Sequence, residues 1–356
     1  MSDKKWNTLI HNGPYFPEPY EPLPQNVTIL YKNRPYPLDY KNTDNKFRMS
    51  SEEAMYYFAQ IIERDNRLKS NTRKSQSGDQ TFVTNFCNDW NTILGDTKLN
   101  WDYIDFSPVV NYIHDQSENK KKLSKEEKKR KKEVKEKIAD IYGYAIIDDQ
   151  KRSMNYMVEL AGLYQGHGEQ QFRGHIKRRI LPQDITINAS IDPPCSYFGT
   201  DCKWGRVIED KSVSWLISWD NPITGKKTYK GLDRTTSHIV QESDTKKFDK
   251  ARLLDQNIDK IRRLYFKDLW SETDQIRQLA TAVYLLDKLA IRPGAEKDEE
   301  KEANTLGLTT LKCENIEFRE DNIIKLKFMG KSSILFEKKV KIDDIVFDNL
   351  LVNCNE

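Results

Sequence analysis

The segment KKKLSKEEKKRKKEVKEK, residues 120–137, limits the possible folds of this chain more than any other. Ser124 and Glu127 have the spacing of a capping box, which predicts that a helix begins at Ser124. From 125 to 133 this helix would carry no apolar side chain, and an apolar stripe begins only with Val134, Ile138 and Ile141. A helix without an apolar face has nothing to bury, so we expect it to project into solvent and to dock only near its end.

The same segment concentrates the positive charge of the chain. It holds ten lysines, one arginine and four glutamates, a net charge of +7. The whole chain carries +3, so the remainder carries −4. Such a concentration attracts polyanions, with binding that weakens as salt is added. The alternative interpretation is an ordinary solvated helix face, and the sequence leaves both open.

The remaining pattern predicts a mixed α/β (α+β) protein. Seven prolines between residues 5 and 40 indicate extended chain that leads into short strands. Helical spacing begins near Ser50, short helices follow over 80–118, strands over 145–235 and helices again from about Asp244. The C-terminal part predicts three strands with a turn at Met329–Lys331. Three regions are expected: a β-rich lobe (5–40 and 120–240), a helical or mixed insertion (41–119) and a further lobe (241–356).

Several function classes find no support in the sequence. There is no run of about 18 apolar residues and no secretion signal at the N-terminus. Five histidines lack ligand spacing, and five scattered cysteines include no C-x-x-C pair, so no metal or other cofactor is expected and the cysteines are predicted to be free thiols. No Gly-rich phosphate loop, H-E-x-x-H or G-x-S-x-G motif is present.

Arg292 is the first candidate for chemistry. It follows the apolar helical pattern DQIRQLATAVYLLDKLAI and precedes Pro293 and Gly294. Proline ends a helix and glycine permits a tight reversal, so the arginine would lie on a rigid corner. A guanidinium fork suits two phosphate oxygens. The alternative is an ordinary ion pair with Asp287, Glu296 or Glu299.

Two further basic sites lie at predicted turns. In FMGKSSILF two strand-like segments meet, which places Lys331 at a hairpin tip, where an ammonium can protonate a leaving oxygen or contact a phosphate. In HIKRRILPQD, Lys177, Arg178 and Arg179 precede a strand and would suit phosphate contacts. The alternatives are a solvated hairpin lysine and a solvated sheet edge.

These stretches together resemble the eukaryotic-type DNA topoisomerase I family, the type IB enzymes. The matching stretches run in order along nearly the whole chain: KWNTLIHNGPYFPEPYEPLPQNV, LSKEEKKRKKE, IKRRILPQDITINAS, DKLAIRPGAEKDEEKEANTLG and FMGKSSI. The resemblance implies a bilobed clamp around duplex DNA, with the basic helix as a connector and residues 241–356 as the first part of a catalytic lobe. It also implies a nuclear protein that relaxes supercoils without ATP or metal.

The resemblance assigns roles to particular residues. Arg292 would stabilise the negative charge that builds on the phosphoryl oxygens, and Lys331 would protonate the leaving 5′ oxygen. Other positions that match DNA contacts of the family are Lys120, His167, Lys177, Arg178, Arg179, Trp215, Tyr229, Lys230, Lys247, Pro293, Gly294, Ala295, Glu296, Lys297 and Thr305.

The sequence also departs from the family pattern. Gln165 and His167 replace two arginines, which would weaken or alter the grip on DNA, and Ser332 replaces an aspartate. The last residues, VFDNLLVNCNE, correspond to the middle of the family's catalytic lobe, and its second arginine, histidine and Ser-Lys-x-x-Tyr segment have no counterpart. We therefore expect this chain alone to lack the nucleophile, which a second polypeptide or a longer product would supply. The alternative is a non-catalytic DNA-binding relative.

Overall fold

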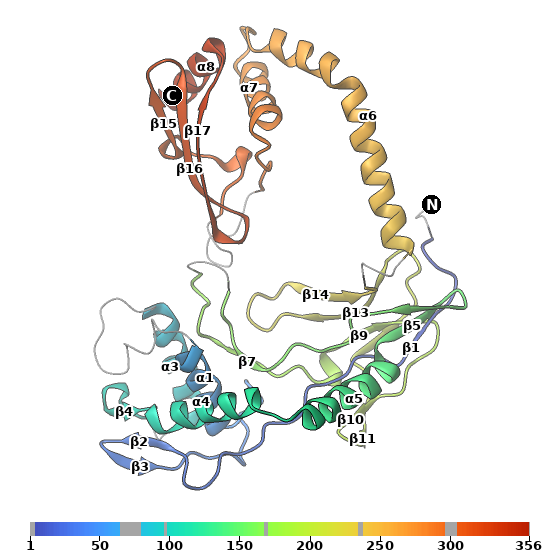
Figure 1. Ribbon diagram of the computed structural model, residues 1–356, viewed down its shortest axis with the longest axis vertical. Coiled ribbons are helices and arrows are strands. Elements are labelled where there is room, and N and C mark those ends of the chain that lie inside the picture. Colours follow the sequence, from blue (N-terminus) through green and yellow to red (C-terminus); the bar gives the residue numbers. More distant parts are fainter. Residues whose placement is uncertain are drawn as a thin grey trace. The chain divides into compact units, whose positions relative to one another are not determined.

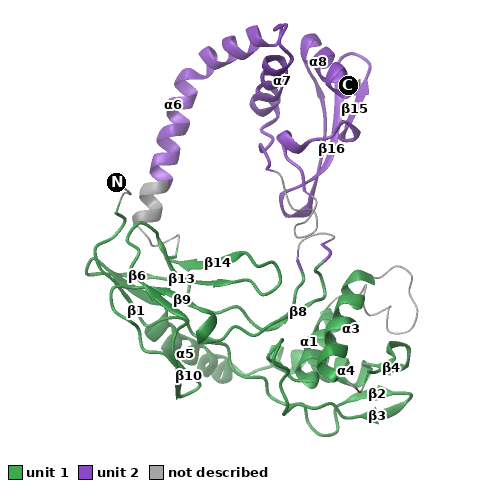
Figure 2. Cartoon of the chain, turned by 180° about the vertical axis from the view of Figure 1, so that it is seen from behind, with its two compact units in different colours: residues 1–165, 172–242 green, residues 166–171, 243–356 purple. Residues whose placement is uncertain are grey.

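The computed structural model describes residues 4–64, 80–95, 98–166, 170–233, 238–295 and 305–355. It confirms a mixed α/β fold, in which the helices and several small sheets form two compact units (Figures 1 and 2). Unit 1 comprises residues 1–165 and 172–242, and unit 2 comprises residues 166–171 and 243–356. No described helix combines the length and the apolar character that crossing a membrane requires.

Unit 1 contains a first hydrophobic core built mainly by helices. The elements around it are α1 (Ser51–Arg64), α3 (Gln80–Leu94), α4 (Ser107–Lys121) and the small sheet β3-β2-β4, formed by Arg34–Tyr36, Ile29–Tyr31 and Ile104–Asp105. The ring of Phe58 is buried here and stacks on Phe86, with 4.3 Å between the ring centroids. Helices were predicted at both places, near Ser50 and over 80–118, and both predictions are confirmed.

A second core of unit 1 is built by strands. The N-terminal strand β1 (Leu9–His11) pairs antiparallel with β5 (Tyr144–Ile147), which pairs with β6 (Gln150–Ser153). A four-stranded sheet has the order β12-β9-β13-β14, formed by Arg206–Ile208, Thr186–Asn188, Trp215–Asp220 and Lys227–Gly231. Two further strand pairs are β7 with β8 (Gly162–Leu163 and Ile176–Lys177) and β10 with β11 (Ser196–Tyr197 and Thr200–Asp201). The strands predicted over 145–235 are thus confirmed.

The charged segment forms α5 (Lys125–Tyr142), as its capping box predicts. The Ser124 hydroxyl accepts a hydrogen bond from the Glu127 amide at 3.2 Å, and the Ser124 amide donates to the Glu127 carboxylate at 2.8 Å. No residue of α5 is buried, which confirms that the helix projects. The prediction that α5 docks through its apolar stripe is wrong in part. Val134 and Ile141 are exposed, and only Ile138 is half-buried.

Unit 2 has a single core between helices and a three-stranded sheet. Its helices are α6 (His238–Asp268, which begins in unit 1), α7 (Asp274–Leu289) and α8 (Asp344–Asn355). The antiparallel sheet has the order β15-β16-β17, formed by Ile316–Arg319, Ile323–Gly330 and Ile334–Lys341. Helix α6 begins about six residues before the predicted start, whereas the three predicted C-terminal strands are confirmed.

The prediction of free cysteines is wrong for four of the five. Cys195 and Cys202 form a disulfide across the β10–β11 hairpin, and Cys313 and Cys354 form one that ties α8 to the start of the sheet in unit 2. The second pair is 41 residues apart in the sequence, so only the fold brings it together. Cys87 is a free thiol, and burial raises its pKa to about 12.

Candidate active site

Arg292 lies on a backbone corner that directly follows helix α7. The helix ends at Leu289 because Ala290 adopts the left-handed conformation, with φ of 51°. The helix therefore ends before the proline that was predicted to stop it. The Arg292 carbonyl accepts a hydrogen bond from the Leu308 amide at 2.9 Å, and the Pro293 carbonyl accepts from the Thr309 amide at 2.7 Å. These bonds fix the corner and leave the guanidinium exposed.

The expected partner of Arg292 is bound to other groups. Arg262 donates two hydrogen bonds to the Asp287 carboxylate, at 2.9 and 3.0 Å, and the Tyr265 hydroxyl donates a third at 2.8 Å. The hydrogen bond from Arg262 is the main cause that lowers the pKa of Asp287. An Arg292–Asp287 ion pair is thereby ruled out as the explanation for the arginine. The other two alternatives, Glu296 and Glu299, lie outside the described residues.

Lys331 lies at the tip of the β16–β17 hairpin, as predicted. The last residue pair of the ladder is Gly330 with Ile334, so the loop consists of residues 331–333. The turn is two residues later than predicted, because Ser332 and Ser333 both adopt positive φ, of 64° and 55°. Glycine is the residue expected at such angles, so the two serines did not indicate that the loop lies at 331–333.

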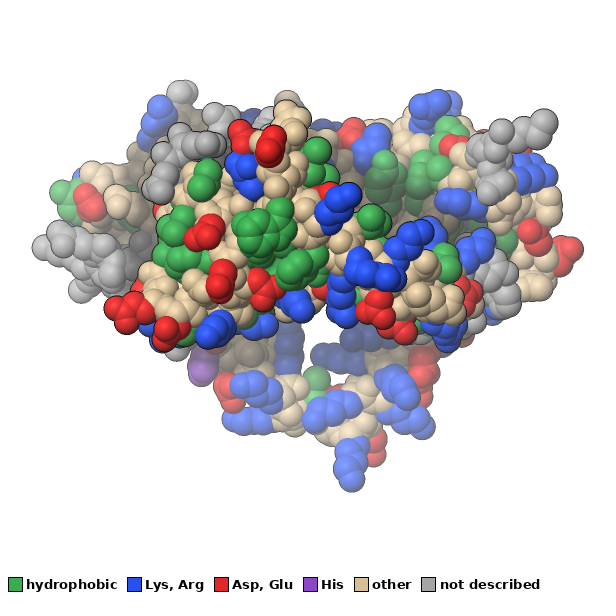
Figure 3. Space-filling model, turned by 90° about the horizontal axis from the view of Figure 1, so that it is seen from above, with side chains coloured by type: hydrophobic (Ala, Val, Ile, Leu, Met, Phe, Trp, Pro, Cys, Tyr) green, Lys and Arg blue, Asp and Glu red, His purple; other side chains and the backbone are tan. Residues whose placement is uncertain are grey.

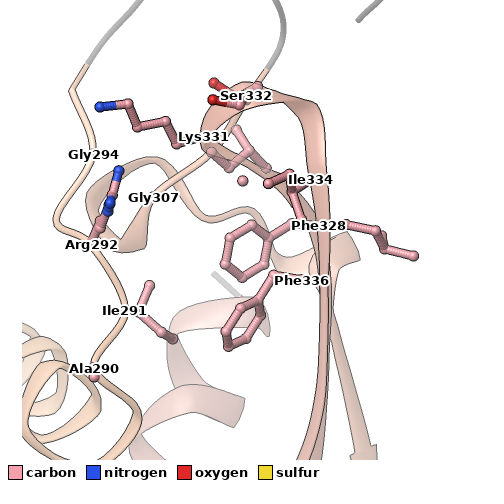
Figure 4. A pocket seen from close by; sticks show the side chains of 14 residues that line it. Ala290, Ile291, Arg292, Gly294, Gly307, Phe328, Lys331, Ser332, Ile334 and Phe336 are labelled. Atoms are coloured by element: carbon pink, nitrogen blue, oxygen red, sulfur yellow. The ribbon is translucent and has the colours of Figure 1, made fainter.

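One cavity of about 780 Å³ brings the two candidates together. Arg292 and Lys331 both line it, and so do Gly294 and Thr305 from the predicted DNA-contact set. Figure 4 shows the charged ends of Arg292 and Lys331 on the same side of the pocket, above the side chains of Ile291, Phe328 and Phe336. The two phenylalanine rings stack with centroids 4.9 Å apart.

This arrangement suits an anion with several oxygens. Within the described part of the chain, no carboxylate forms an ion pair with Arg292 or Lys331. A guanidinium and an ammonium held side by side on rigid backbone can contact different oxygens of one phosphate. Apolar side chains beneath them lower the local polarity, which strengthens such contacts. Among the described residues, no cluster of three possible metal ligands is present.

The segment 305–310 also contributes to the pocket, although the resemblance gives a role only to its first residue, Thr305. The segment contains Gly307, which lines the pocket, and Thr309, whose hydroxyl donates to the Pro293 carbonyl at 2.9 Å. The only local signal was a glycine between two apolar residues, which is common in loops and does not point to a site.

The basic triplet is engaged with carboxylates of unit 1. Lys177 bonds to Glu159 at 2.8 Å, Arg178 to Asp184 at 3.1 Å, and Arg179 to Glu53. The Glu53 side chain is buried in this pair, and the burial raises its pKa despite the opposing effect of Arg179. Much of the triplet's charge is therefore balanced inside the protein.

Three other predicted DNA contacts lie together on the β13–β14 hairpin. Trp215 and Tyr229 have ring centroids 5.5 Å apart, and the Lys230 ammonium lies over the Trp219 ring at 5.8 Å. The Tyr229 ring is about half exposed. The exposed Tyr229 ring is a surface on which a nucleic-acid base can stack, whereas Lys230, the next residue of the strand, points to the other face of the sheet.

The remaining predicted contacts are dispersed. Lys120 is exposed near the end of α4, and Lys247 on α6 pairs with Asp244 at 2.7 Å. Pro293 and Ala295 are exposed on the Arg292 corner, outside the set that lines the pocket. The other three predicted residues, His167, Glu296 and Lys297, lie outside the described residues.

Comparisons with known proteins cover the chain almost completely. A model of the eukaryotic DNA topoisomerase I DNA-binding fragment matches residues 4–232, and a model of the catalytic core of the same family matches residues 236–356. DNA topoisomerase 1 of Homo sapiens is 36% identical over 356 residues, which is 97% of this chain and 44% of the human protein. DNA topoisomerase 1 of Candidozyma auris is 36% identical over 357 residues, and DNA topoisomerase 1 alpha of Arabidopsis thaliana is 37% identical over 350. The chain spans less than half the length of these relatives.

Proposed function

The chain belongs to the eukaryotic DNA topoisomerase I family, and we propose that it forms the DNA-binding part and the first portion of the catalytic lobe of a type IB topoisomerase. Its substrate is duplex DNA, its site of action is the nucleus, and it contributes to the ATP-independent relaxation of supercoils. The proposal is supported above all by the pocket that Arg292 and Lys331 share within unit 2.

The chemistry is a transesterification at phosphorus. A tyrosine oxygen, supplied by a second polypeptide or a longer product, attacks a backbone phosphodiester and forms a 3′-phosphotyrosyl bond. The bond from phosphorus to the 5′ oxygen breaks, and the tyrosine proton passes to solvent or a nearby base. Religation reverses these steps. One ester bond replaces another in each direction, so the reaction consumes no ATP and needs no redox cofactor.

Arg292 and Lys331 have separate roles in this reaction. The Arg292 guanidinium binds the non-bridging oxygens, whose negative charge grows in the transition state. The Lys331 ammonium donates a proton to the 5′ oxygen as it leaves. The bonds to the carbonyls of Arg292 and Pro293 hold the corner before DNA arrives, so little reorganisation is needed during the reaction.

The hairpin formed by β13 and β14 would bind the DNA backbone outside the pocket. Trp215, Tyr229 and Lys230 supply two aromatic rings and a cation on one sheet. Lys120, Lys247 and the residues of the Arg292 corner would add further phosphate contacts, as would the triplet Lys177–Arg179 if DNA displaces its internal partners. The lobes expected at 5–40 with 120–240, at 41–119 and at 241–356 would together form the DNA clamp.

A second candidate function is a DNA-binding protein without catalysis. It is favoured by Gln165, which stands where the resemblance expects an arginine and whose carbonyl accepts a hydrogen bond from Arg173 at 2.8 Å. Without a cation at position 165, the protein would bind the DNA backbone more weakly. Under this alternative, no added polypeptide would restore strand cleavage.

A plasmid-relaxation assay separates the two candidates. The chain is mixed with a polypeptide that carries a Ser-Lys-x-x-Tyr segment and the other missing residues, and relaxation of supercoiled plasmid is measured without ATP or metal. We expect relaxation with the mixture, and its loss with Arg292→Ala or Lys331→Ala. Lys327→Ala is the matched control, because Lys327 lies exposed on β16, the strand that leads to Lys331, and outside the pocket. Salt-sensitive DNA binding without relaxation, for every polypeptide added, would favour the non-catalytic function.

A further inference from the structure

The segment 305–310, which we call the bridging segment, is hydrogen-bonded to both sides of the pocket. On one side the Leu308 amide donates to the Arg292 carbonyl at 2.9 Å, and the Thr309 amide donates to the Pro293 carbonyl at 2.7 Å. On the other side the Leu306 amide donates to the Met329 carbonyl at 2.7 Å, two residues before Lys331. The bridging segment is therefore a direct backbone connection between the two cations.

The bridging segment touches the Arg292 corner at a contact between two glycines. A Cβ atom added to Gly307 would lie 2.4 Å from the Gly294 Cα and 2.8 Å from the Arg292 carbonyl oxygen. Both distances are too short for carbon contacts, and both atoms belong to the backbone, so no rotation of a side chain can relieve them. Any side chain at Gly307 must push the Arg292 corner and the bridging segment apart.

The need for glycine at position 307 comes from this contact alone. Gly307 has φ of −133° and ψ of −174°, an extended conformation that every residue can adopt. Gly294 differs, because its φ of +87° would strain any other residue even without the contact. Substitution of Gly307 therefore changes the spacing at the pocket without imposing backbone strain of its own.

From these contacts we propose that Gly307 is a positioning residue, which sets the separation of Arg292 and Lys331 so that both reach one phosphate. The proposal rests on the proposed function, because it assumes that a DNA phosphate is the anion bound. Catalytic groups must be held within about 0.5 Å of their productive positions. A shift of several tenths of an ångström at the Gly294–Gly307 contact would separate the two cations while leaving each of them intact.

The test uses DNA binding and therefore needs no nucleophile. Two nicked duplexes of identical sequence are compared by fluorescence anisotropy, one with a 3′-phosphate at the nick and one with a 3′-hydroxyl. The ratio of their dissociation constants, which we call the phosphate gain, reports contacts of the protein with that phosphate. A mutation that merely destabilises the fold lowers the affinity for both duplexes equally and leaves the phosphate gain unchanged.

We expect Gly307→Ala to reduce the phosphate gain by up to about tenfold, approaching the loss in Arg292→Ala, while binding to the 3′-hydroxyl duplex persists. Gly95→Ala is the matched control. Gly95 has φ of +62° and open space around its Cβ position, so the substitution strains the backbone at a place in unit 1 that lines no part of the pocket. This variant should keep the full phosphate gain.

The outcomes distinguish a failure of the proposed phosphate-binding function of the pocket from a failure of the proposed role of Gly307. If wild-type protein shows no phosphate gain, or Arg292→Ala retains it, the proposed function of the pocket fails. If those results hold but folded Gly307→Ala retains the full gain, the positioning role is wrong. Should Gly307→Ala not fold, Thr309→Val replaces it, because it removes only the hydroxyl bond to the Pro293 carbonyl. A smaller loss of about twofold is then expected, and an unchanged gain would count against the proposal.

Discussion

Acid should destabilise unit 1 through the buried imidazole of His11. Only 4% of this residue is exposed. Its Nδ1 accepts a hydrogen bond from the Gly13 amide at 3.1 Å, so Nε2 carries the proton and donates to the Asn188 carbonyl, also at 3.1 Å. A second proton would have to lie on Nδ1, against the Gly13 N–H. Burial lowers the pKa of His11 to about 4, although the hydrogen bond to Asn188 opposes the shift.

The size of the effect follows from proton linkage. In the unfolded chain the pKa of His11 is near 6.5. Between that pH and about 4, the unfolded state therefore binds a proton that the folded state does not bind. The stability that His11 contributes is therefore complete above pH 6.5 and is lost as the pH falls toward 4. Between pH 7 and pH 5 the free energy of unfolding should fall by about 2 kcal/mol from this group alone.

Urea unfolding at a series of pH values measures this loss. Six of the seven tryptophans belong to unit 1, so tryptophan fluorescence follows that unit. His11→Gln should be less stable at pH 7, yet should lose about 2 kcal/mol less than wild type on going to pH 5. His114→Gln is the same substitution at an exposed histidine, and it controls for the exchange of an imidazole for an amide. Parallel pH profiles for wild type and His11→Gln would refute the reasoning.

Three further predictions concern unit 2. In a urea titration of unit 2 followed by the fluorescence of Trp270 in a variant that lacks the other tryptophans, Leu285→Ala should lower the free energy of unfolding by about 2–5 kcal/mol. Leu279→Ala should change it by less than about 0.5 kcal/mol, because Leu285 is 2% exposed and Leu279 is 66% exposed. Arg262→Ala should raise the pKa of Asp287 toward its ordinary value, measured by NMR titration of the carboxyl group, and should reduce the stability that this carboxylate loses as the pH falls. Ser332→Val should be about 1–2 kcal/mol less stable than Ser332→Gly in thermal unfolding, because position 332 has φ of 64°.

Local signals in the sequence were reliable where the structure depends on neighbouring residues. The capping box at Ser124 required only a hydroxyl and a carboxylate three residues apart, and the helix begins there. Lys331 was placed at a hairpin tip from two apolar runs alone, and the ladder confirms it. Each of these features is determined within a few residues of the chain, so periodicity and turn chemistry were enough to find it.

Features that depend on distant residues were not predictable in this way. Asp287 is five residues from Arg292, yet it bonds to Arg262 and Tyr265 on another helix. The spacing along the chain therefore suggested the wrong ion pair. The Cys313–Cys354 disulfide and the contact of Gly307 with Gly294 have the same origin, since tertiary packing alone sets which residues meet.

Helix α7 shows how a correct prediction can rest partly on the wrong residues. The apolar spacing that predicted the helix comprises Ile276, Leu279, Val283, Leu286 and Leu289 or Ala290. The residues that the helix buries are Ala280, Thr281, Tyr284, Leu285 and Leu289, so Leu289 alone is common to both sets. Of the other predicted residues, Val283 and Leu286 are half-buried against the core, and Ile276 and Leu279 are exposed. Figure 3 shows a group of hydrophobic side chains on the face of the molecule that it draws.

Helical spacing of apolar residues indicates that a helix has a face to bury, but it does not identify the side chains that pack against the rest of the protein. In α7 the hydroxyls of Tyr284 and Thr281 made the buried side look less apolar than the exposed one. Both hydroxyls take part in hydrogen bonds within unit 2: Tyr284 accepts from the Asp343 amide at 3.3 Å, and Thr281 donates to the Arg277 carbonyl at 2.8 Å. Satisfied polar atoms cost little to bury, so a side with two hydroxyls can form the core as well as a purely apolar one. The position of Arg292 follows from this choice of face, because burial of Leu289 and Ile291 fixes the end of the helix directly before the corner.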